Sequence, residues 1–474
     1  MNVSFLQELL NSIAEQGRQL LPWGIGQQTD IVTLCRALVS NRGEASGVAI
    51  AGQILEHFRR LPRAERSGFY EFLAHGLQPE PLAVKAMAEA YLSTPGPDAL
   101  ARLQRAVESP RQEFFRRLNL APGATAEIVA LRREILGLLK DKPELRAVDE
   151  DLKHLLSSWF NRGFLVLRRI DWNTPAAILE KIIAYEAVHE ITGWDDLRRR
   201  LDPADRRCFA FFHPSLVDEP LIFVEVALMN EIPGAIADVL TEAPKQTGPA
   251  AAATTAVFYS ISNCQEGLRG ISFGNFLIKQ VAEELLRERP GLTTFVTLSP
   301  VPGFARWLNR GLAEADATIV ASHERGALAG LSGDAWMRSA EIKARLEAPM
   351  LAMAAKYMLA AKADDGRPLD PVARFHLGNG ARLGRINWPA DLSARGLREA
   401  HGLMVNYRYD LKDIEANHEA YANENRVVAA RSVRALLKSN ERATVAQRLL
   451  EFANDPDSTA RRITKVATKT ETAR

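Results

Sequence analysis

The sequence predicts an α+β protein, in which an all-helical N-terminal bundle is followed by a mixed α/β domain. Apolar residues recur at helical spacing through the first 162 residues, as at Ile128, Leu131 and Ile135. After Gly163, short runs rich in β-branched and aromatic residues alternate with helical stretches. A chain of 474 residues is long enough for several domains. We therefore expect a helical domain over residues 1–162, an α/β domain over residues 163–457 and a disordered polar tail over residues 458–474.

Short polar connections that contain proline or glycine punctuate the expected helical bundle. They lie at residues 93–97, 109–110 and 121–123. No fixed-period repeat runs through this region, so a solenoid is not expected. Because amphipathic helices pack through apolar stripes and the region carries no chemical motif, we expect it to serve in oligomerisation.

Strands and helices are expected to alternate through the α/β domain. Strands are expected over residues 164–170, 208–212, 221–227, 256–262 and 294–298. Helices are expected over residues 176–202, 274–289, 326–361 and 427–452. Two further apolar runs lie at residues 373–377 and 403–409.

Composition excludes several classes of protein. The net charge of +2 lacks the basic excess of a nucleic-acid-binding surface. No run approaches the roughly 18 apolar residues that a membrane-spanning helix needs, so no membrane partner is expected. The three cysteines show no CxxC spacing, which argues against a zinc or redox site and fits a reducing compartment. Since the N-terminus has no signal or transit pattern, we expect a cytoplasmic protein.

A glycine-bearing join between an expected strand and an expected helix is the first candidate site. Residues 261–276 contain Gly267, Gly270 and Gly274, and glycine lets a backbone approach a ligand closely. The N–H groups at a helix start suit a diphosphate, and Arg269 would add positive charge. The spacing matches neither the Walker A pattern nor GxGxxG, so an ordinary connecting loop stays an alternative.

The same join spells GxSxG from Gly270 to Gly274, which is the pattern of the nucleophile elbow in serine hydrolases. In that elbow the serine follows its strand directly, whereas about nine residues separate Ser262 from Ser272 here. We interpret the match as accidental and keep a hydrolase built on Ser272 as an alternative.

Two single residues are candidates for catalysis. Ser299 follows an expected buried strand, and Pro300 and Pro302 stiffen the turn after it. His376 lies between apolar residues and a Gly-Asn-Gly turn, where an imidazole can act as a general acid or base. Taken singly, Ser299 is also explained as a hydrogen-bonding turn residue and His376 as a core histidine.

Four peptides resemble, in order and spacing, those of the malonyl-CoA decarboxylase family. They are FHPSL at 212–216, FYSISNCQEGLRGISFGNFLIKQV at 258–281, LSPVPGF at 298–304, and the stretch from FHLGNGARLGRINW to GLMVNYRY at 375–409. The resemblance implies a GNAT-like catalytic domain, which binds CoA where two adjacent strands splay apart. In this chain those strands are residues 256–262 and 294–298.

The resemblance also implies which residues form the site. The CoA diphosphate is expected on the backbone of Arg269, Gly270, Ile271, Ser272, Phe273, Gly274 and Asn275. The family's catalytic serine and histidine fall on Ser299 and His376, with Tyr409 and Asn379 as supports. The GNAT consensus Q/R-x-x-G-x-G/A is not matched literally by residues 265–270, so the individual phosphate-binding amides stay open.

The implied reaction converts malonyl-CoA to acetyl-CoA and carbon dioxide, in a homotetramer. Ser299 would hold and polarise the malonyl group, and His376 would protonate the α-carbon. Because the thioester is itself the electron sink, no cofactor and no metal are expected. Three alternatives remain: an acyltransferase with the same CoA pocket, the hydrolase built on Ser272, and a non-catalytic CoA-binding scaffold.

Overall fold

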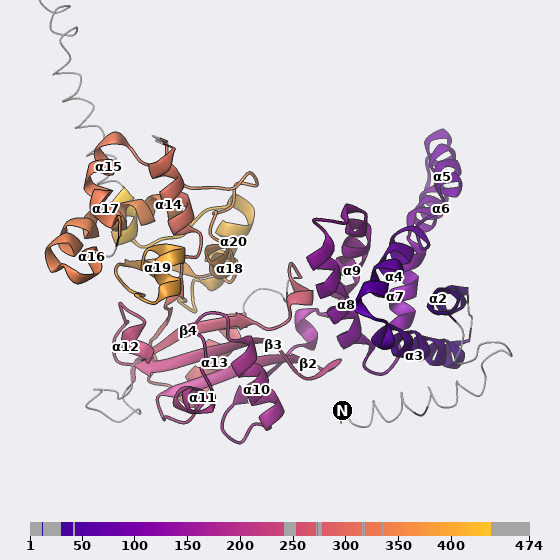
Figure 1. Cartoon of the computed structure of the whole chain (residues 1–474), viewed down its shortest axis with the longest axis horizontal. Coiled ribbons are helices and arrows are strands. Elements are labelled where there is room, and N and C mark those ends of the chain that lie inside the picture. Colours follow the sequence, from indigo (N-terminus) through magenta and orange to yellow (C-terminus); the bar gives the residue numbers. More distant parts are fainter. Residues whose placement is uncertain are drawn as a thin grey trace, which may run out of the picture.

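The structure is a computed structural model, and it describes residues 12, 30–40, 43–240, 253–271, 273, 277–314, 316, 318–333 and 335–437. The tail expected at 458–474 and the end of the helix expected at 427–452 lie outside these residues. Figure 1 shows a helical domain joined to a second domain that contains a sheet.

The N-terminal part is a helical bundle, as the apolar periodicity predicts. Phe114, Phe115 and Leu152 are buried in its core. The helices α5 (Pro81–Ser93) and α6 (Pro97–Val107) form a hairpin that projects from the bundle (Figure 1). The other helices described here are α2 (Ile31–Ser40), α3 (Glu44–Arg60), α4 (Arg63–His75), α7 (Pro110–Leu118), α8 (Ala124–Leu138) and α9 (Arg146–Trp159).

The second part is built on a mixed sheet. Its strands are β1 (Val166–Ile170), β2 (Arg206–His213), β3 (Leu216–Met229), β4 (Thr255–Asn263), β5 (Thr294–Thr297), β6 (Ser299–Pro300), β7 (Arg382–Asn387) and β8 (Met404–Arg408). They are ordered β1-β2-β3-β4-β5-β8-β6, and β7 also pairs with β8. The pair β4–β5 is parallel, whereas the other pairs within the described residues are antiparallel.

Helices cover both faces of the sheet. Because successive side chains of a strand point to opposite sides, one strand can pack against helices on both faces. Cys208 and Ala210 of β2 pack with α10 (Ala176–Tyr185) and α11 (Trp194–Leu201). Phe209 and Phe211 of the same strand join the core that contains α13 (Leu277–Glu288). Apolar residues on both faces therefore account for the nearly continuous apolar run of this strand.

Two expected helices are divided. The helix expected at 176–202 is α10 and α11, because one carboxylate oxygen of Glu186 accepts the N–H groups of Val188 and His189, both at 2.7 Å, and forms a turn. The helix expected at 326–361 is interrupted at Gly333, whose φ of 75° no helix can continue. Its parts are α15 (Ser322–Leu328), η5 (Ala329–Leu331), α16 (Ala335–Arg338) and α17 (Ala340–Leu359).

Four further helices gather with α15–α17 above the sheet in the view of Figure 1. They are α14 (Phe304–Ala313), α18 (Pro371–Gly378), α19 (Ala394–Ala400) and α20 (Ile414–Glu424). The apolar run at 373–377 is thus helical, and the run at 403–409 contains β8. None of the described helices is both long and apolar enough to span a bilayer.

The parallel strands β4 and β5 part midway along β4. They pair from Thr255 with Thr294 to Phe258 with Thr297, and the N–H of Leu298 donates a last hydrogen bond to the Phe258 carbonyl. The chain then turns into β6, which pairs with β8, while β4 continues to Asn263. The splay expected from residues 256–262 and 294–298 is therefore present.

Candidate active site

Ser299 lies where β5 gives way to β6, beside the point at which β4 and β5 part. Its side chain is buried, and its Oγ is 3.0 Å from Nε2 of His376. The Ser299 hydroxyl donates to Oγ1 of Thr297 at 2.8 Å. Because Thr297 and Ser299 are two residues apart in an extended segment, their side chains lie on the same side.

His376 is carried by α18, a helix with strong start signals. Asp370 caps it by accepting the N–H of Ala373 at 2.7 Å, and Pro371 occupies the first turn. The imidazole stacks on the ring of Tyr407, with 4.4 Å between centroids and 25° between planes. Burial lowers the pKa of His376 to about 3, so the ring is neutral at pH 7.

Tyr409 completes a hydrogen-bonded line with the serine and the histidine. Its hydroxyl is 2.8 Å from Nδ1 of His376, and burial raises its pKa well above the ordinary value. Since the Ser299 hydroxyl donates to Thr297, the lone pairs of Oγ accept from Nε2–H of the imidazole. The neutral ring thus carries its hydrogen on Nε2, and Nδ1 accepts from Tyr409.

The acyl pocket, which is lined in part by Phe258, Leu298, Ser299, Phe375 and His376, is a small cavity of about 230 Å³ beside this line of residues. Its other walls are mostly apolar, and none of the described residues that line it is a lysine or an arginine. A negative charge placed here would lie next to neutral donors and apolar carbon.

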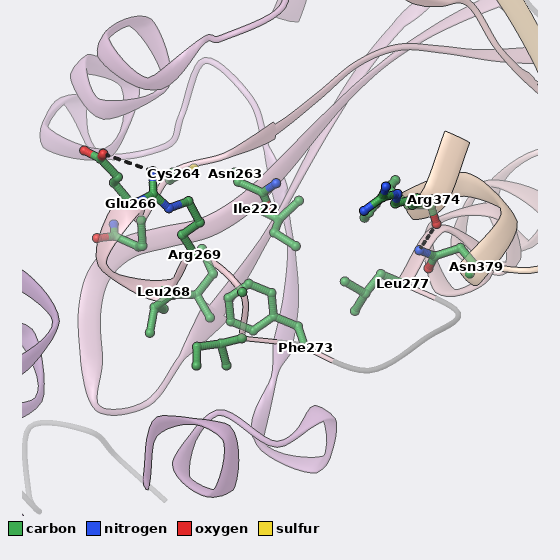
Figure 2. Close-up of a pocket in the computed structure, with 16 residues that line it drawn as sticks. Ile222, Asn263, Cys264, Glu266, Leu268, Arg269, Phe273, Leu277, Arg374 and Asn379 are labelled. Atoms are coloured by element: carbon green, nitrogen blue, oxygen red, sulfur yellow. Dashed lines mark hydrogen bonds and ion pairs between the residues drawn. The ribbon is translucent and has the colours of Figure 1, made fainter. Parts of the chain in front are cut away.

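The loop pocket, of about 540 Å³, is lined by the segment after β4 and by α18 (Figure 2). It shares Asn263 and Phe375 with the acyl pocket, so the two cavities adjoin. Of the expected diphosphate segment, Arg269, Gly270, Ile271 and Phe273 line it. Ser272, Gly274 and Asn275 lie outside the described residues.

The GxSxG stretch does not follow its strand. The short helix η4 (Glu266–Leu268) lies between the end of β4 at Asn263 and Gly270, which has a φ of 78°. The context of a nucleophile elbow, a strand that turns directly into a helix, is therefore lacking.

Asn379 lies apart from the Ser299–His376–Tyr409 line. Its Nδ2 donates to the Phe375 carbonyl at 2.8 Å, and it lines the loop pocket rather than the acyl pocket. Its buried Oδ1 has no hydrogen-bond partner among the described residues. Asn379 therefore belongs to the wall of the loop pocket.

Sequence reasoning missed three residues of the site. Thr297 and Tyr407 contact Ser299 and His376 directly, and Arg374 lines the loop pocket opposite Arg269 (Figure 2). Thr297 lies two residues before Ser299 and Arg374 two before His376. Both spacings can be seen in the sequence. Which side chains face the site becomes clear only from the pairing of β5 and β8 in the structure.

Family comparisons agree with this geometry. Residues 163–447 match the malonyl-CoA decarboxylase C-terminal domain, and residues 77–160 match the N-terminal domain of the same family. The chain belongs to the malonyl-CoA decarboxylase family. It is accordingly a carboxy-lyase that acts on malonyl-CoA, and the recognition made from the four peptides is confirmed.

Relatives of this decarboxylase include proteins of known structure. The mitochondrial malonyl-CoA decarboxylase of Anser anser anser is 37% identical over 350 residues, which cover 69% of each chain. The crystal structure of malonyl-CoA decarboxylase from Rhodopseudomonas palustris is 54% identical, with a TM-score of 0.82 over 85% of this chain and 98% of that one. The one from Agrobacterium vitis is 55% identical, with a TM-score of 0.81 over 86% and 100%.

Proposed function

We propose that Ser299 and His376 carry out the decarboxylation of malonyl-CoA, with Tyr409 behind the histidine. The observation that carries the proposal is the hydrogen-bonded line from Ser299 through His376 to Tyr409, of which Ser299 and His376 line the acyl pocket. The adjoining loop pocket is large enough to lead a pantetheine arm to it.

We propose that CoA occupies the loop pocket with its diphosphate on the segment that begins at Arg269. The N–H of Gly270, together with the side chains of Arg269 and Arg374, supplies a hydrogen-bond donor and positive charge. The amide oxygen of Asn379 accepts an N–H of the pantetheine arm, which gives that oxygen the partner it lacks among the described residues. The arm then passes between β4 and β6, and the thioester enters the acyl pocket.

In the proposed reaction the bond between the α-carbon and the carboxylate breaks, and its electron pair forms an enolate on the thioester. The acyl pocket favours this step, because the described residues that line it offer the carboxylate apolar walls and no cation, and carbon dioxide leaves uncharged. On binding, the Ser299 hydroxyl turns from Thr297 to the substrate oxygen that gains charge. Nε2–H of His376 protonates the α-carbon as the Tyr409 hydroxyl passes its proton to Nδ1. After acetyl-CoA leaves, a proton from solvent reaches Nε2 and the proton on Nδ1 returns to Tyr409, so each turnover consumes one solvent proton.

The thioester supplies the electron sink, so we propose that the reaction requires no further cofactor and no metal. Among the described residues no group of acidic, histidine or cysteine side chains has the arrangement of a metal site. Extended dialysis against a chelator is expected to leave turnover unchanged.

The proposal is tested with malonyl-CoA as the single substrate. Ser299→Ala and His376→Asn are each expected to lower kcat by about 10²- to 10⁴-fold, while binding of CoA measured by calorimetry changes little. Acetyl-CoA and carbon dioxide are the expected products of the unaltered protein. Malonate with free thiol would instead indicate a hydrolase, and wild-type turnover in either variant would remove that residue from the mechanism.

We further propose that the protein is a cytoplasmic homotetramer whose contacts involve the α5–α6 hairpin. Helix α5 buries none of its residues within the chain, and Leu82 and Leu92 are each 76% exposed. Apolar side chains on a projecting hairpin are suited to burial against a second copy.

The three cysteines are free and buried, which suits a reducing compartment. Cell fractionation tests the location.

A further inference from the structure

A buried arginine of the helical domain contacts the loop that lines the CoA pocket. Arg132 lies on α8 and is 2% exposed. Its Nη1 donates to the carbonyl oxygens of Gly267 at 2.7 Å and Arg269 at 3.0 Å, and its Nε donates to Asp149 at 2.8 Å. A charged donor in a buried position thus holds two main-chain carbonyls of a segment more than a hundred residues away.

The carbonyl of Arg269 and the N–H of Gly270 belong to one trans peptide and point in opposite directions. With the carbonyl directed at Arg132, the Gly270 N–H is directed away from the helical domain. Gly270 lines the loop pocket on that side. The direction of a main-chain donor in the pocket is therefore set by a side chain of the other domain.

This N–H differs from its neighbours in its bonding. The N–H groups of Leu268, Arg269 and Ile271 each donate to a carbonyl within the loop. The N–H of Gly270 donates to no acceptor among the described residues. It is thus available to an anionic oxygen in the pocket.

The loop also presses closely on α8 at a second point. A Cβ at Gly267 would lie 1.9 Å from the Val129 carbonyl oxygen, so only glycine fits between the loop and the helix. The position of the loop is therefore fixed by direct contact as well as by the guanidinium. These two contacts bind the same short segment to one face of α8.

We propose that Arg132 is a positioning residue for CoA: it holds the Arg269–Gly270 peptide so that its N–H receives the diphosphate. The helical domain is then part of the CoA site in addition to any role in assembly. This inference rests on the proposed placement of the diphosphate at this loop.

Arg132→Met tests the inference, and Arg111→Met is its matched control. Arg111 is also buried in the helical domain, 4% exposed, and donates to Asp151 at 2.7 Å and the Leu73 carbonyl at 2.8 Å, but it contacts no part of the loop. We expect Arg132→Met to weaken CoA binding by about 10- to 100-fold, the effect of losing a hydrogen bond to a charged group. Arg111→Met is expected to lower thermal stability and leave CoA affinity within about twofold.

A substrate pair separates positioning from general damage. For Arg132→Met, kcat/KM on malonyl-CoA is expected to fall by the same factor as CoA affinity. On malonyl-pantetheine, which lacks the diphosphate, kcat/KM is expected to stay within about twofold of the unaltered protein. Equal losses on both substrates, or unchanged CoA affinity in the folded variant, would overturn the inference.

Calorimetry of CoA in a Ser299→Ala background keeps this test independent of the catalytic assignment, because no turnover is needed. Arg132→Lys retains the charge beside Asp149 but offers no forked donor, so its affinity for CoA is expected to lie between that of the unaltered protein and that of the Arg132→Met variant. If the unaltered protein handles malonyl-CoA and malonyl-pantetheine equally, the proposed diphosphate placement is wrong, and the inference about Arg132 fails with it.

Discussion

The hydroxyl of Thr297 decides which nitrogen of His376 carries the hydrogen. It accepts from the Ser299 hydroxyl and also from the N–H of Tyr407 at 3.1 Å, so it is fixed from two sides. Thr297→Val removes the acceptor, and the Ser299 hydroxyl then donates to Nε2 and moves the hydrogen of the ring to Nδ1. We expect kcat to fall by about tenfold or more. Thr297→Ser, which keeps the hydroxyl, is expected to retain most of the activity.

Nitrogen NMR of His376 provides a second readout of this prediction, since the two ring nitrogens differ in chemical shift between tautomers. A Thr297→Val protein with wild-type kcat and an unchanged tautomer would show that Thr297 has no positioning role.

The low pKa of His376 predicts how stability varies with pH. The unfolded chain binds a proton near the ordinary pKa of 6.5, but the folded chain does so only near 3. Stability is therefore complete above about pH 6.5 and falls by about 1.4 kcal/mol per unit as the pH drops below it. Between pH 6.5 and 5, the unaltered protein is expected to lose about 2 kcal/mol of unfolding free energy through this histidine. His376→Gln is expected to abolish that loss, and urea unfolding at the two pH values measures it. Identical pH slopes in the two proteins would contradict it.

Among the helices, α18 is stabilised at its start by Asp370, the N-cap residue immediately before it. Asp370 is buried and caps the helix, and burial raises its pKa to about 6. Asp370→Ala is expected to cost about 1 kcal/mol of stability and to lower kcat, because the cap orients the helix that carries His376. Asp370→Asn retains a capping oxygen and is expected to restore both. Thermal melting and turnover measure the two effects.

The contact between α8 and η4 yields a paired prediction. Gly267→Ala places a methyl group against the Val129 carbonyl, so both stability and CoA affinity are expected to fall. Gly137→Ala, on the same helix α8 but with no atom near its Cβ, is expected to stabilise by about 0.5–1 kcal/mol. Urea unfolding and calorimetry report the two quantities. If the Gly267→Ala protein kept its CoA affinity, the contact between the loop and α8 would have no role in CoA binding.

At the scale of elements, the sequence predicted most of the fold. Periodicity located the helical domain and the strands β2 to β5, because their apolar patterns are long and regular. It missed the break at Glu186, which depends on a side chain that accepts two N–H groups of the following residues. Periodicity also left residues 373–377 unassigned, although Asp370 followed by Pro371 is a sequence signal for the start of a helix.

The candidate site was less accessible to sequence reasoning. Ser299, His376 and Tyr409 were found through the family resemblance, and they meet because β8 pairs with both β5 and β6. Asn379 was expected beside them, but α18 places it toward the loop pocket. Arg132 had no local signal at all, since its contacts are made with a loop of the other domain.

For the whole molecule, substitutions on the projecting α5–α6 hairpin are expected to change the oligomeric state. Leu82→Asp combined with Leu92→Asp places charge on a surface that buries nothing within the chain. The fold of each subunit is therefore expected to persist while the proposed tetramer dissociates. Sedimentation measures the mass, and melting controls for folding. A tetramer that survives both changes would place the subunit contacts elsewhere.

The parting of β4 and β5 has a consequence for how freely this protein can diverge. Past Phe258, β4 presents main-chain N–H and C=O groups on the side that β5 has left, while its side chains point above and below the sheet. Such an edge looks the same to a ligand whichever side chains the strand carries. Every substitution along residues 259–263 except proline is therefore expected to leave the main-chain groups of this edge in place, because proline alone removes the donor. The side chains of Tyr259, Ile261 and Asn263 stay constrained by the acyl pocket that they line.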